Sequence, residues 1–456
     1  MTKHENLIEK VAEAPAVALE KTVDATEALA KSITAKRPIQ EVKDYWHNLG
    51  PGLTTGAADD DPSGIATYSQ TGARYGFQLL WLSLFTFPLM AVVQEMCARI
   101  GLQTGRGLAA NIRLHFPRPI LYICTIALFA ANTFNIGADL GAMAQATQLL
   151  FPDSSFFLLV LGFTVISLAL QIFTSYAKYS KYLKWLALLL FSYIFSALSV
   201  NLNWAEIWHN TITPSITLTK EQIILICAVL GTTISPYLFF WQTSQEIEEE
   251  VLDGKTTVAS RQGASDAAVK SMRIDVWTGM FISNLVMFFI IAACGATLYS
   301  AGITNITTAA DAAEALKPFA GNSAYLLFAL GIIGTGMLAV PVLAGSASYA
   351  LSESFGWKQG LYRNLPQAYA FYGVIMISML IGLGLNFIGL DPIKALIYSA
   401  VANGMVAPIV LILIVLISSN KKIMGNRANH PLTSAFGWLV TGIMILAGLA
   451  TIFALF

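Results

Sequence analysis

Eleven long apolar stretches dominate this chain of 456 residues. Only 12% of its residues are charged, whereas a soluble domain carries about 25%. A helix of roughly 20 apolar residues crosses a bilayer, and a bilayer offers the backbone no other hydrogen-bond partners. We therefore predict an all-α polytopic membrane protein. The predicted spans are residues 52–72, 78–104, 119–150, 156–174, 182–201, 222–243, 273–299, 325–352, 368–385, 393–418 and 434–455.

The basic residues are distributed unevenly between the predicted loops. With the N-terminus placed in the cytoplasm, 23 of the 27 lysines and arginines lie on the cytoplasmic side. The exceptions are Arg74, Lys220, Lys317 and Lys394. This bias is what the positive-inside rule gives for an odd number of spans. We predict a plasma-membrane protein with a cytoplasmic N-terminus and an external C-terminus.

Residues 1–44 contain no predicted span and are rich in Ala, Glu and Lys. We expect a cytoplasmic tail or surface helix there, and a membrane domain over residues 45–456. Pro15 interrupts the weak apolar stripe of this segment, which favours the tail. The net charge is +0, so composition indicates no nucleic-acid partner. The four cysteines lie in apolar stretches without metal-site spacing, and we expect buried, inert thiols.

Proline interrupts two of the apolar stretches. The first stretch contains Asp61-Pro62-Ser63-Gly64, and the sixth contains Ile234-Ser235-Pro236-Tyr237. A charge at membrane depth costs about 3 kcal/mol or more on insertion scales, so it usually marks an ion or substrate path. If spans one to five and six to ten are repeats, the breaks occupy equivalent places, and five spans per repeat make the halves inverted. This pattern predicts the LeuT-type five-plus-five inverted repeat with an eleventh helix.

The two breaks concentrate oxygen atoms. Pro62 frees the carbonyl of Ala58, and Pro236 frees the carbonyl of Thr232, because proline lacks an N–H and clashes with the preceding turn. Gly64 allows a sharp turn. The Asp61 carboxylate and the hydroxyls of Ser63, Thr232 and Ser235 complete the set. Hard oxygens suit Mg²⁺, Mn²⁺ or Ca²⁺ better than soft metals, so we predict a divalent-cation site here.

Other acids surround this candidate site in the sequence. Asp59, Asp60 and Asp61 are consecutive, and helical neighbours point about 100° apart, so all three cannot face one site. Asp61 sits at the break and is the predicted ligand; Asp59 and Asp60 either line the access path or pack as polar groups. The competing interpretation is a capping cluster at the membrane surface. Asp139 lies mid-span, either as a structural acid or as a proton or electrostatic relay.

Three further features have simpler interpretations. Glu95 and Arg99 are spaced to pair at i, i+4. Asn403-Gly404 interrupts the tenth span, which indicates close packing or a mobile element. The acidic run Glu246–Glu250 is expected to be a solvated helix end, and the sharper alternative is a funnel for an exiting ion.

These residues resemble the Nramp family of divalent metal transporters. The resemblance runs from about Gly50 to Phe456, and its most specific stretch is Gln94–Ala109, which is similar to the family's second span with its Ala-Arg-Leu-Gly-x-x-Thr-Gly signature. Gly50-Pro51-Gly52 resembles the family's entry to span one. The resemblance implies the LeuT-type fold and metal uptake, commonly driven by protons. It also implies that Asp61 and the Thr232 carbonyl bind the metal and that Asp139 takes part in proton movement.

The chain departs from the family at several positions that the resemblance marks as functional. Gly64 stands in place of an Asn ligand, Ser235 in place of a Met ligand, and Tyr237 in place of a His. Ala400 falls where span ten contributes a Gln, and Ala142 replaces a Glu near Asp139. Loss of the sulfur removes the preference for soft metals, and smaller side chains leave room for bound water. The site is therefore similar to that of the Nramp-related magnesium transporters, a divergent branch.

The sequence thus predicts a divalent-cation transporter, not an enzyme, that works by alternating access. Mg²⁺ is the favoured ion and Mn²⁺ the next, with gradient-driven uptake preferred to proton coupling. We expect a monomer in the lipid bilayer, with no cofactor besides the transported cation. The alternative is a secondary transporter of an organic solute on the same fold. The acid cluster argues against an anion, and the few aromatics beside the break argue against an amine.

Overall fold

Helices account for the regular structure of the computed structural model, which describes residues 50–174, 191–199 and 202–455. No strand occurs among these residues. The first part contains α3 (Pro51–Asp59), α4 (Pro62–Tyr75), α5 (Trp81–Thr104), α6 (Leu108–His115), α7 (Arg118–Leu150), α8 (Phe156–Phe173), α10 (Phe191–Ser199) and α11 (Trp204–Ile212). The second contains α12 (Lys220–Thr233), α13 (Pro236–Leu252), α14 (Val258–Arg261), α15 (Asp266–Cys294), α16 (Ala309–Glu314), α17 (Lys317–Ala320), α18 (Ala324–Phe355), α19 (Tyr369–Leu385), α20 (Pro392–Ser419), α21 (Lys421–Met424) and α22 (Pro431–Leu455).

Eight helical segments of the described residues are long and apolar enough to cross a membrane. The first predicted span consists of two shorter helices, α3 and α4, and the ninth is α19, with 17 residues. The fifth, 182–201, lies partly outside the described residues, as does the predicted tail over 1–44. The number of eleven spans therefore stays a prediction.

Both predicted helix breaks are present. α3 ends at Asp59 and α4 begins at Pro62, while α12 ends at Thr233 and α13 begins at Pro236. Each new helix starts on its proline, whose fixed backbone angle suits the first turn and whose missing N–H is not needed there. Asn403 and Gly404, by contrast, do not interrupt α20, which is continuous from Pro392 to Ser419.

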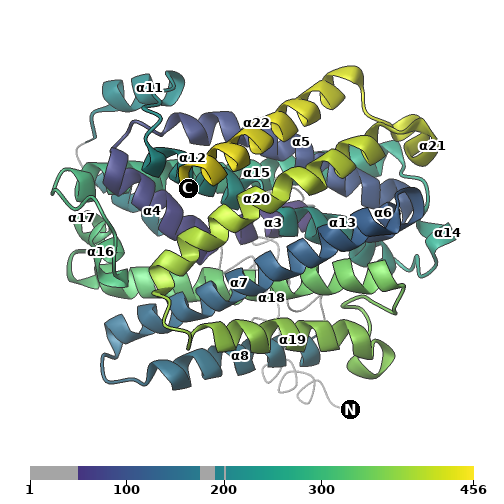
Figure 1. Cartoon of the computed structure of the whole chain (residues 1–456), viewed down its shortest axis with the longest axis horizontal. Helices are drawn as coiled ribbons and strands as arrows, with labels where there is room; N and C mark the ends of the chain where they lie inside the picture. The colour runs from purple at the N-terminus through teal and green to yellow at the C-terminus, as the bar shows by residue number, and fades with distance from the viewer. Residues whose placement is uncertain (1–49, 175–190, 200–201, 456) are drawn as a thin grey trace, which may run out of the picture. The chain divides into compact units, whose positions relative to one another are not determined.

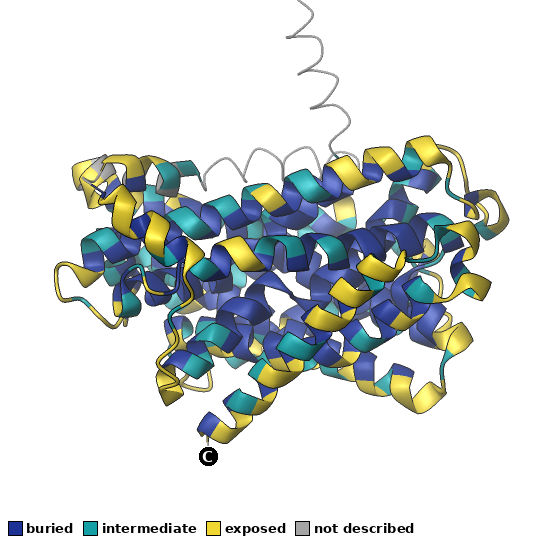
Figure 2. Cartoon of the chain, turned by 90° about the horizontal axis from the view of Figure 1, so that it is seen from above, coloured by how far each residue is buried: buried dark blue, intermediate teal, exposed yellow. Residues whose placement is uncertain are grey.

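The broken helices lie at the centre of the helix array. α12 and α13 form the most buried of the candidate spans, whereas α8 and α22 are the least buried. Figure 2 shows the buried residues gathered in the middle and the exposed residues on the outer helices and loops. α3 packs against α15 and α13, α12 packs against α20 and α22, and α7 packs against α18, α19 and α20 (Figure 1). The polar residues at the two breaks, Asp61 and Ser235, are buried and therefore held away from lipid.

Glycines bring the broken helices into backbone contact with their neighbours. A Cβ on Gly279 of α15 would lie 2.1 Å from the carbonyl oxygen of Gly52 in α3, so only glycine fits there. A Cβ on Gly404 of α20 would lie 2.8 Å from the carbonyl oxygen of Cys227 in α12. Close packing is thus the correct interpretation of Asn403-Gly404. Asp275 of α15 also accepts hydrogen bonds from the backbone N–H groups of Gly52 (2.6 Å) and Leu53 (3.1 Å), and so caps α3.

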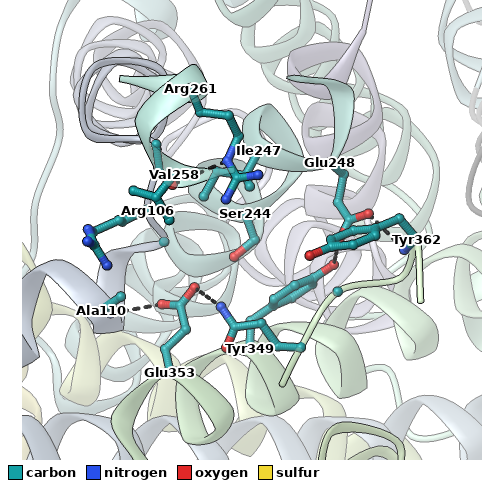
Figure 3. A pocket seen from close by; sticks show the side chains of 14 residues that line it. Arg106, Ala110, Ser244, Ile247, Glu248, Val258, Arg261, Tyr349, Glu353 and Tyr362 are labelled. Carbon is teal, nitrogen blue, oxygen red and sulfur yellow. Dashed lines mark hydrogen bonds between the residues drawn. The ribbon is translucent and has the colours of Figure 1, made fainter. Parts of the chain in front are cut away.

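The acidic run at the end of α13 is not a solvated helix end. Glu246, Glu248 and Glu250 are buried. Glu248 accepts hydrogen bonds from the hydroxyl of Tyr349 and from the backbone N–H groups of Leu361 (2.8 Å) and Tyr362 (3.0 Å), beside a pocket (Figure 3). The prediction of a solvated end is wrong because the loop that follows α18 folds over this carboxylate.

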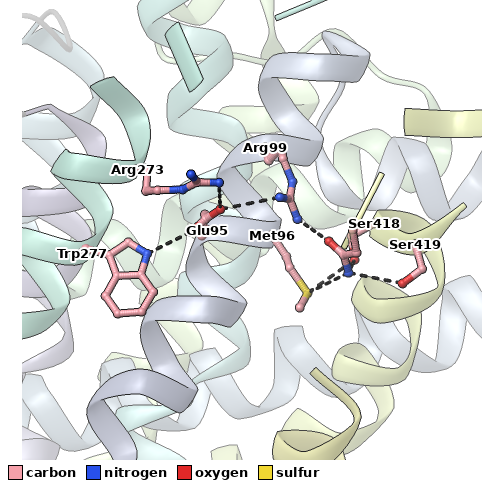
Figure 4. A network of polar contacts seen from close by, with 8 residues as sticks. Glu95, Met96, Arg99, Arg273, Trp277, Ser418 and Ser419 are labelled. Carbon is pink, nitrogen blue, oxygen red and sulfur yellow. Dashed lines mark hydrogen bonds and ion pairs between the residues drawn. The ribbon is translucent and has the colours of Figure 1, made fainter. Parts of the chain in front are cut away.

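Glu95 and Arg99 pair as predicted, with 3.6 Å between Oε1 and Nη1, but they belong to a larger network (Figure 4). Glu95 also accepts from Arg273 (2.8 Å) and from the indole N–H of Trp277 (2.9 Å), both on α15. Arg99 donates to Asn429, just before α22. This network joins α5, α15 and the start of α22. The four cysteines are free and buried, as expected.

Candidate functional site

Asp61 occupies the gap between α3 and α4 and is completely buried. Its Oδ1 accepts hydrogen bonds from the hydroxyl of Ser63 (2.6 Å) and the backbone N–H of Gly64 (2.7 Å), which makes Asp61 the N-cap of α4. The positive end of the α4 dipole also favours a carboxylate at this position. The residues that follow Pro62 therefore fix one face of the carboxylate.

The other face of Asp61 meets two helices far away in the sequence. Its Oδ2 accepts a hydrogen bond from the side-chain amide of Asn135 in α7 (3.0 Å) and lies 3.5 Å from the hydroxyl of Tyr237 in α13. The amide oxygen of Asn135 accepts in turn from Ser399 of α20 (2.8 Å). Asp61 is thus the meeting point of α4, α7, α13 and, through Asn135, α20.

Tyr237 also joins the two helix breaks directly. Its hydroxyl donates to the carbonyl oxygen of Ala58 in α3, at 2.9 Å. Ala58 is the residue whose carbonyl Pro62 was predicted to free, so the oxygen expected to bind a cation accepts a phenolic hydrogen bond here. A cation that reached both Ala58 and Asp61 would have to replace this hydroxyl.

The second break places its oxygens beside the first. The hydroxyl of Ser235 donates to the carbonyl oxygens of Gly231 (2.6 Å) and Thr232 (2.8 Å), so it satisfies the end of α12. A Cβ on Gly64 would lie 3.2 Å from the Thr232 hydroxyl oxygen, so α4 and α12 approach closely here. Ala400 is buried, and its carbonyl oxygen lies only 2.1 Å from where a Cβ on Gly231 would stand. The structure thus groups Asp61, Ala58, Thr232, Ser235 and Tyr237.

The neighbouring acids are buried rather than exposed at a surface. Asp59 has 0% of its surface exposed and Asp60 has 1%, so the surface-cluster interpretation is wrong. Asp59 accepts a hydrogen bond from Ser283 of α15 (2.6 Å). Among the described residues, no hydrogen-bond partner reaches the Oδ1 atom of either acid. A role in the access path stays a prediction.

Asp139 lies one turn after Asn135 on α7, so both face the same side of that helix. It is fully buried, and within the described ranges neither of its carboxylate oxygens has a hydrogen-bond partner. No ion pair joins Asp59, Asp60, Asp61 or Asp139 to a basic group of the described chain. Ionising a buried carboxyl group without a counter-charge is costly, and a cation that arrives beside it offsets that cost.

Three residues at the site escaped the sequence interpretation: Asn135, Ser283 and Ser399. Each is a small polar residue within an apolar helix, at a position with no proline or acid beside it in the chain. The spacing of Asn135 from Asp139, four residues on one helical face, was the one available signal. The contacts of Ser283 and Ser399 depend on packing between helices, which local sequence does not reveal.

Solved structures share the overall fold of this chain. A manganese transporter from Eremococcus coleocola, in complex with an aromatic bis-isothiourea substituted compound, aligns with a TM-score of 0.72 at 17% identity, covering 90% of this chain and 87% of that one. Mhp1, a nucleobase-cation-symport-1 family transporter in a closed conformation with bromovinylhydantoin bound, aligns with a TM-score of 0.54 at 13% identity, covering 89% and 91%. These likenesses confirm the predicted LeuT-type fold.

A family model settles the membership that fold alone leaves open. The model described as natural resistance-associated macrophage protein-like matches residues 52–454, which include both helix breaks and every residue of the candidate site. The chain belongs to the Nramp family.

Proposed function

We propose that this protein moves hydrated divalent cations across the membrane, Mg²⁺ in preference to Mn²⁺, by alternating access around Asp61. Membership of the Nramp family, whose members transport metal ions, supports divalent metal transport in general and speaks against an enzyme. The Eremococcus coleocola relative is itself a manganese transporter. The choice of ion rests on the side chains around Asp61.

The observation that supports this choice most directly is the crowding of the Asp61 carboxylate by hydrogen-bond donors. Ser63 and Gly64 occupy both lone-pair directions of Oδ1, and Asn135 occupies one direction of Oδ2. The Tyr237 hydroxyl faces the remaining direction of Oδ2 at 3.5 Å, so a ligand there would have to displace it. A bare metal ion that needs several protein ligands finds few free oxygens here. An ion that keeps its own water molecules needs only one or two contacts with Asp61, and Mg²⁺ dehydrates more reluctantly than other divalent cations.

The ligand types point the same way. The oxygens grouped at the breaks come from carboxylate, hydroxyl and carbonyl groups of Asp61, Ser63, Thr232, Ser235 and Ala58. Sulfur and imidazole ligands, which give transition metals their advantage over Mg²⁺, are replaced by Ser235 and Tyr237. Without sulfur and imidazole ligands, the described site has no group that would favour soft ions over Mg²⁺.

The surroundings of Ala142 favour transport without protons. Ala142 lines a small apolar pocket together with Ile65, Phe328, Ile332 and Leu396. A proton route needs titratable groups or water within hydrogen-bond reach of one another. Asp139 lies three residues before Ala142 on α7, and the pocket that Ala142 lines is apolar. We propose that the cation gradient alone drives uptake.

Orientation and assembly complete the proposal. The distribution of Lys and Arg supports a cytoplasmic N-terminus and an external C-terminus in the plasma membrane. We propose a monomer, because the site is assembled from helices of a single chain. Impermeant labelling of single cysteines placed before Pro51 and after Leu455, and the mass of the purified protein in detergent, test these two statements.

The decisive experiment measures Mg²⁺ influx, Mn²⁺ influx and lumenal pH together in sealed proteoliposomes. We expect Mg²⁺ entry without acidification. Replacing Asp61 by Asn should abolish influx, whereas Asp253→Asn, which neutralises an exposed acid after α13, should leave it unchanged. Mn²⁺ entry with acidification would contradict the choice of ion and of coupling. Absence of both fluxes, with uptake of an organic solute, would establish the alternative transporter.

A further inference from the structure

A pocket of about 120 Å³ lies at the far end of α13 from the helix break (Figure 3). Its walls come from α13, the end of α18, α14, the α5–α6 connection and the loop after α18. The residues that matter for the argument are Ser244, Glu248, Arg261, Tyr349, Glu353 and Tyr362. A cavity of this size holds several water molecules, and its polar lining would keep them ordered.

One face of α13 connects this pocket to the Asp61 site. Tyr237, Trp241, Ser244 and Glu248 follow one another at spacings of four, three and four residues, so they line the same side of the helix. With a rise of 1.5 Å per residue, Ser244 stands about 10 Å beyond Tyr237 along the axis. Tyr237 touches Asp61, and Ser244 lines the pocket. Trp241 is the large side chain between them.

Trp241 fills this interval completely. Its side chain is 1% exposed, and a Cβ on Gly345 of α18 would lie 2.7 Å from its ring, so the indole rests directly on the α18 backbone. The ring of Tyr349 meets it edge-on, with centroids 6.4 Å apart. In the described structure the indole N–H has no hydrogen-bond partner, although a buried tryptophan usually finds one. The ring is held by packing alone, so it can leave without breaking a hydrogen bond.

The pocket offers oxygen atoms to a hydrated ion. Ser244 is 3% exposed, and its hydroxyl has no partner among the described residues. The Glu353 carboxylate accepts hydrogen bonds from the Gln359 amide (2.8 Å) and the Ala110 N–H (2.9 Å), and its two oxygens together can accept about four. Oε2 of Glu248 accepts a hydrogen bond from the Tyr362 N–H (3.0 Å). These oxygens can bind water molecules that surround a cation.

Two arginines limit how strongly the pocket holds a positive ion. Arg261 donates to the backbone carbonyls of Lys255 (2.9 Å) and Gly105 (3.4 Å) rather than to the two acids. Arg106 also lines the pocket, and Figure 3 shows its guanidinium directed away from Ser244. Two acids and two bases leave little net charge. A cation would therefore bind weakly in this pocket and occupy it only at high concentration.

We infer that the pocket is a vestibule in which a hydrated divalent cation is bound transiently, and that Trp241 is the gate between this vestibule and the Asp61 site. The inference rests on the proposed function for the nature of the ion, but the gate itself rests on packing. When the indole moves off Gly345, the α13 face from Tyr237 to Ser244 becomes a continuous path. The positive-inside rule places this end of the path in the cytoplasm.

Thiol accessibility tests the gate without any need for transport. Ser235→Cys reports on the far side of Trp241, and Ser244→Cys reports on the vestibule; the native cysteines are all buried, so the wild type gives the background. A cationic, impermeant methanethiosulfonate is applied to either side. We expect Trp241→Ala to speed modification of Ser235→Cys by about tenfold or more, since the closed state loses its packing. Trp241→Phe should give an intermediate rate.

The Ser244→Cys reporter serves as the control for folding. Its rate in the Trp241→Ala background should match that in the native background, because Trp241 itself does not line the vestibule. Saturating Mg²⁺ should slow its modification if the ion occupies the vestibule. Equal reactivity of Ser235→Cys with and without Trp241 would overturn the gate. Loss of Mg²⁺ protection, with the effect of Trp241→Ala intact, would support the gate and overturn the cation as occupant. Absence of Mg²⁺ and Mn²⁺ flux would instead refute the proposed function alone.

Discussion

Replacing Gly231 by alanine should push the broken helix α12–α13 away from α20 and slow cation transport. A Cβ on Gly231 would lie 2.1 Å from the carbonyl oxygen of Ala400 and 2.4 Å from the backbone nitrogen of Gly404. Both atoms belong to the backbone, so no side-chain rotation can relieve the contact. The helices must separate, and Thr232 and Ser235 lie one and four residues after Gly231, at the break.

The geometry sets the size of the effect. Ordinary contact begins at 3.4 Å, so α12 must retreat from α20 by about 1 Å. Overpacking of this kind costs about 1–3 kcal/mol. A displacement of about 1 Å at a functional site lowers rates by roughly 10- to 100-fold. We expect Mg²⁺ influx to fall within this range while the protein still inserts and purifies.

The assay compares Gly231→Ala with Gly442→Ala. Gly442 lies within α22, and a Cβ there would meet nothing within 4 Å. Both changes gain helix propensity of about 1 kcal/mol, so the difference in melting temperature between the two variants isolates the clash with α20. Initial Mg²⁺ influx is normalised to reconstituted protein. Wild-type influx and stability in Gly231→Ala would refute the close approach of α12 and α20 described above.

Two further variants remove contacts at the two ends of α3. Tyr237→Phe removes the hydroxyl that donates to the Ala58 carbonyl and approaches Asp61. The oxygens that this hydroxyl leaves can then bind a partly dehydrated ion. Because such a hydrogen bond is worth about 0.5–1.5 kcal/mol, the apparent affinity for Mn²⁺ should improve by roughly two- to tenfold relative to that for Mg²⁺. Competition of Mn²⁺ with Mg²⁺ influx measures this, and an unchanged ratio would contradict the role of Tyr237. Asp275→Ala removes the cap of α3 and should destabilise the protein by about 0.5–2 kcal/mol, whereas Asp275→Asn should have a smaller effect. Thermal unfolding in detergent measures the difference. Equal melting temperatures for the wild type and Asp275→Ala would show that the cap is dispensable.

The features that the sequence predicts well are those with a local physical cause. Proline acts on its own turn, so Pro62 and Pro236 marked the helix breaks within a residue or two of their observed positions. Apolar length predicted the long helices for the same reason. A glycine is weaker evidence, because helices tolerate it where packing requires a close approach. The prediction that Asn403-Gly404 interrupts its helix is wrong for this reason, because α20 continues through Gly404.

The contacts that complete the site have no local cause. Asn135 reaches Asp61 across 74 positions of the chain, and Ser283 reaches Asp59 across 224. Tyr237 was identified as a replacement, but nothing in the sequence places its hydroxyl on the Ala58 carbonyl. The burial of Glu248 depends equally on a loop more than a hundred positions away. Such contacts are fixed by how helices pack, so only the three-dimensional structure reveals them.

The hydrogen bonds from Ser399 through Asn135 to Asp61 place a reciprocal constraint on this protein. The three residues belong to α20, α7 and the start of α4, so both halves of the fold share one line of contact. If a bound ion stabilises one position of α20, thermodynamic linkage requires that this position of α20 raises the affinity for the ion by the same free energy. Lipids, ligands or substitutions that bias α20 would therefore tune ion affinity without touching Asp61.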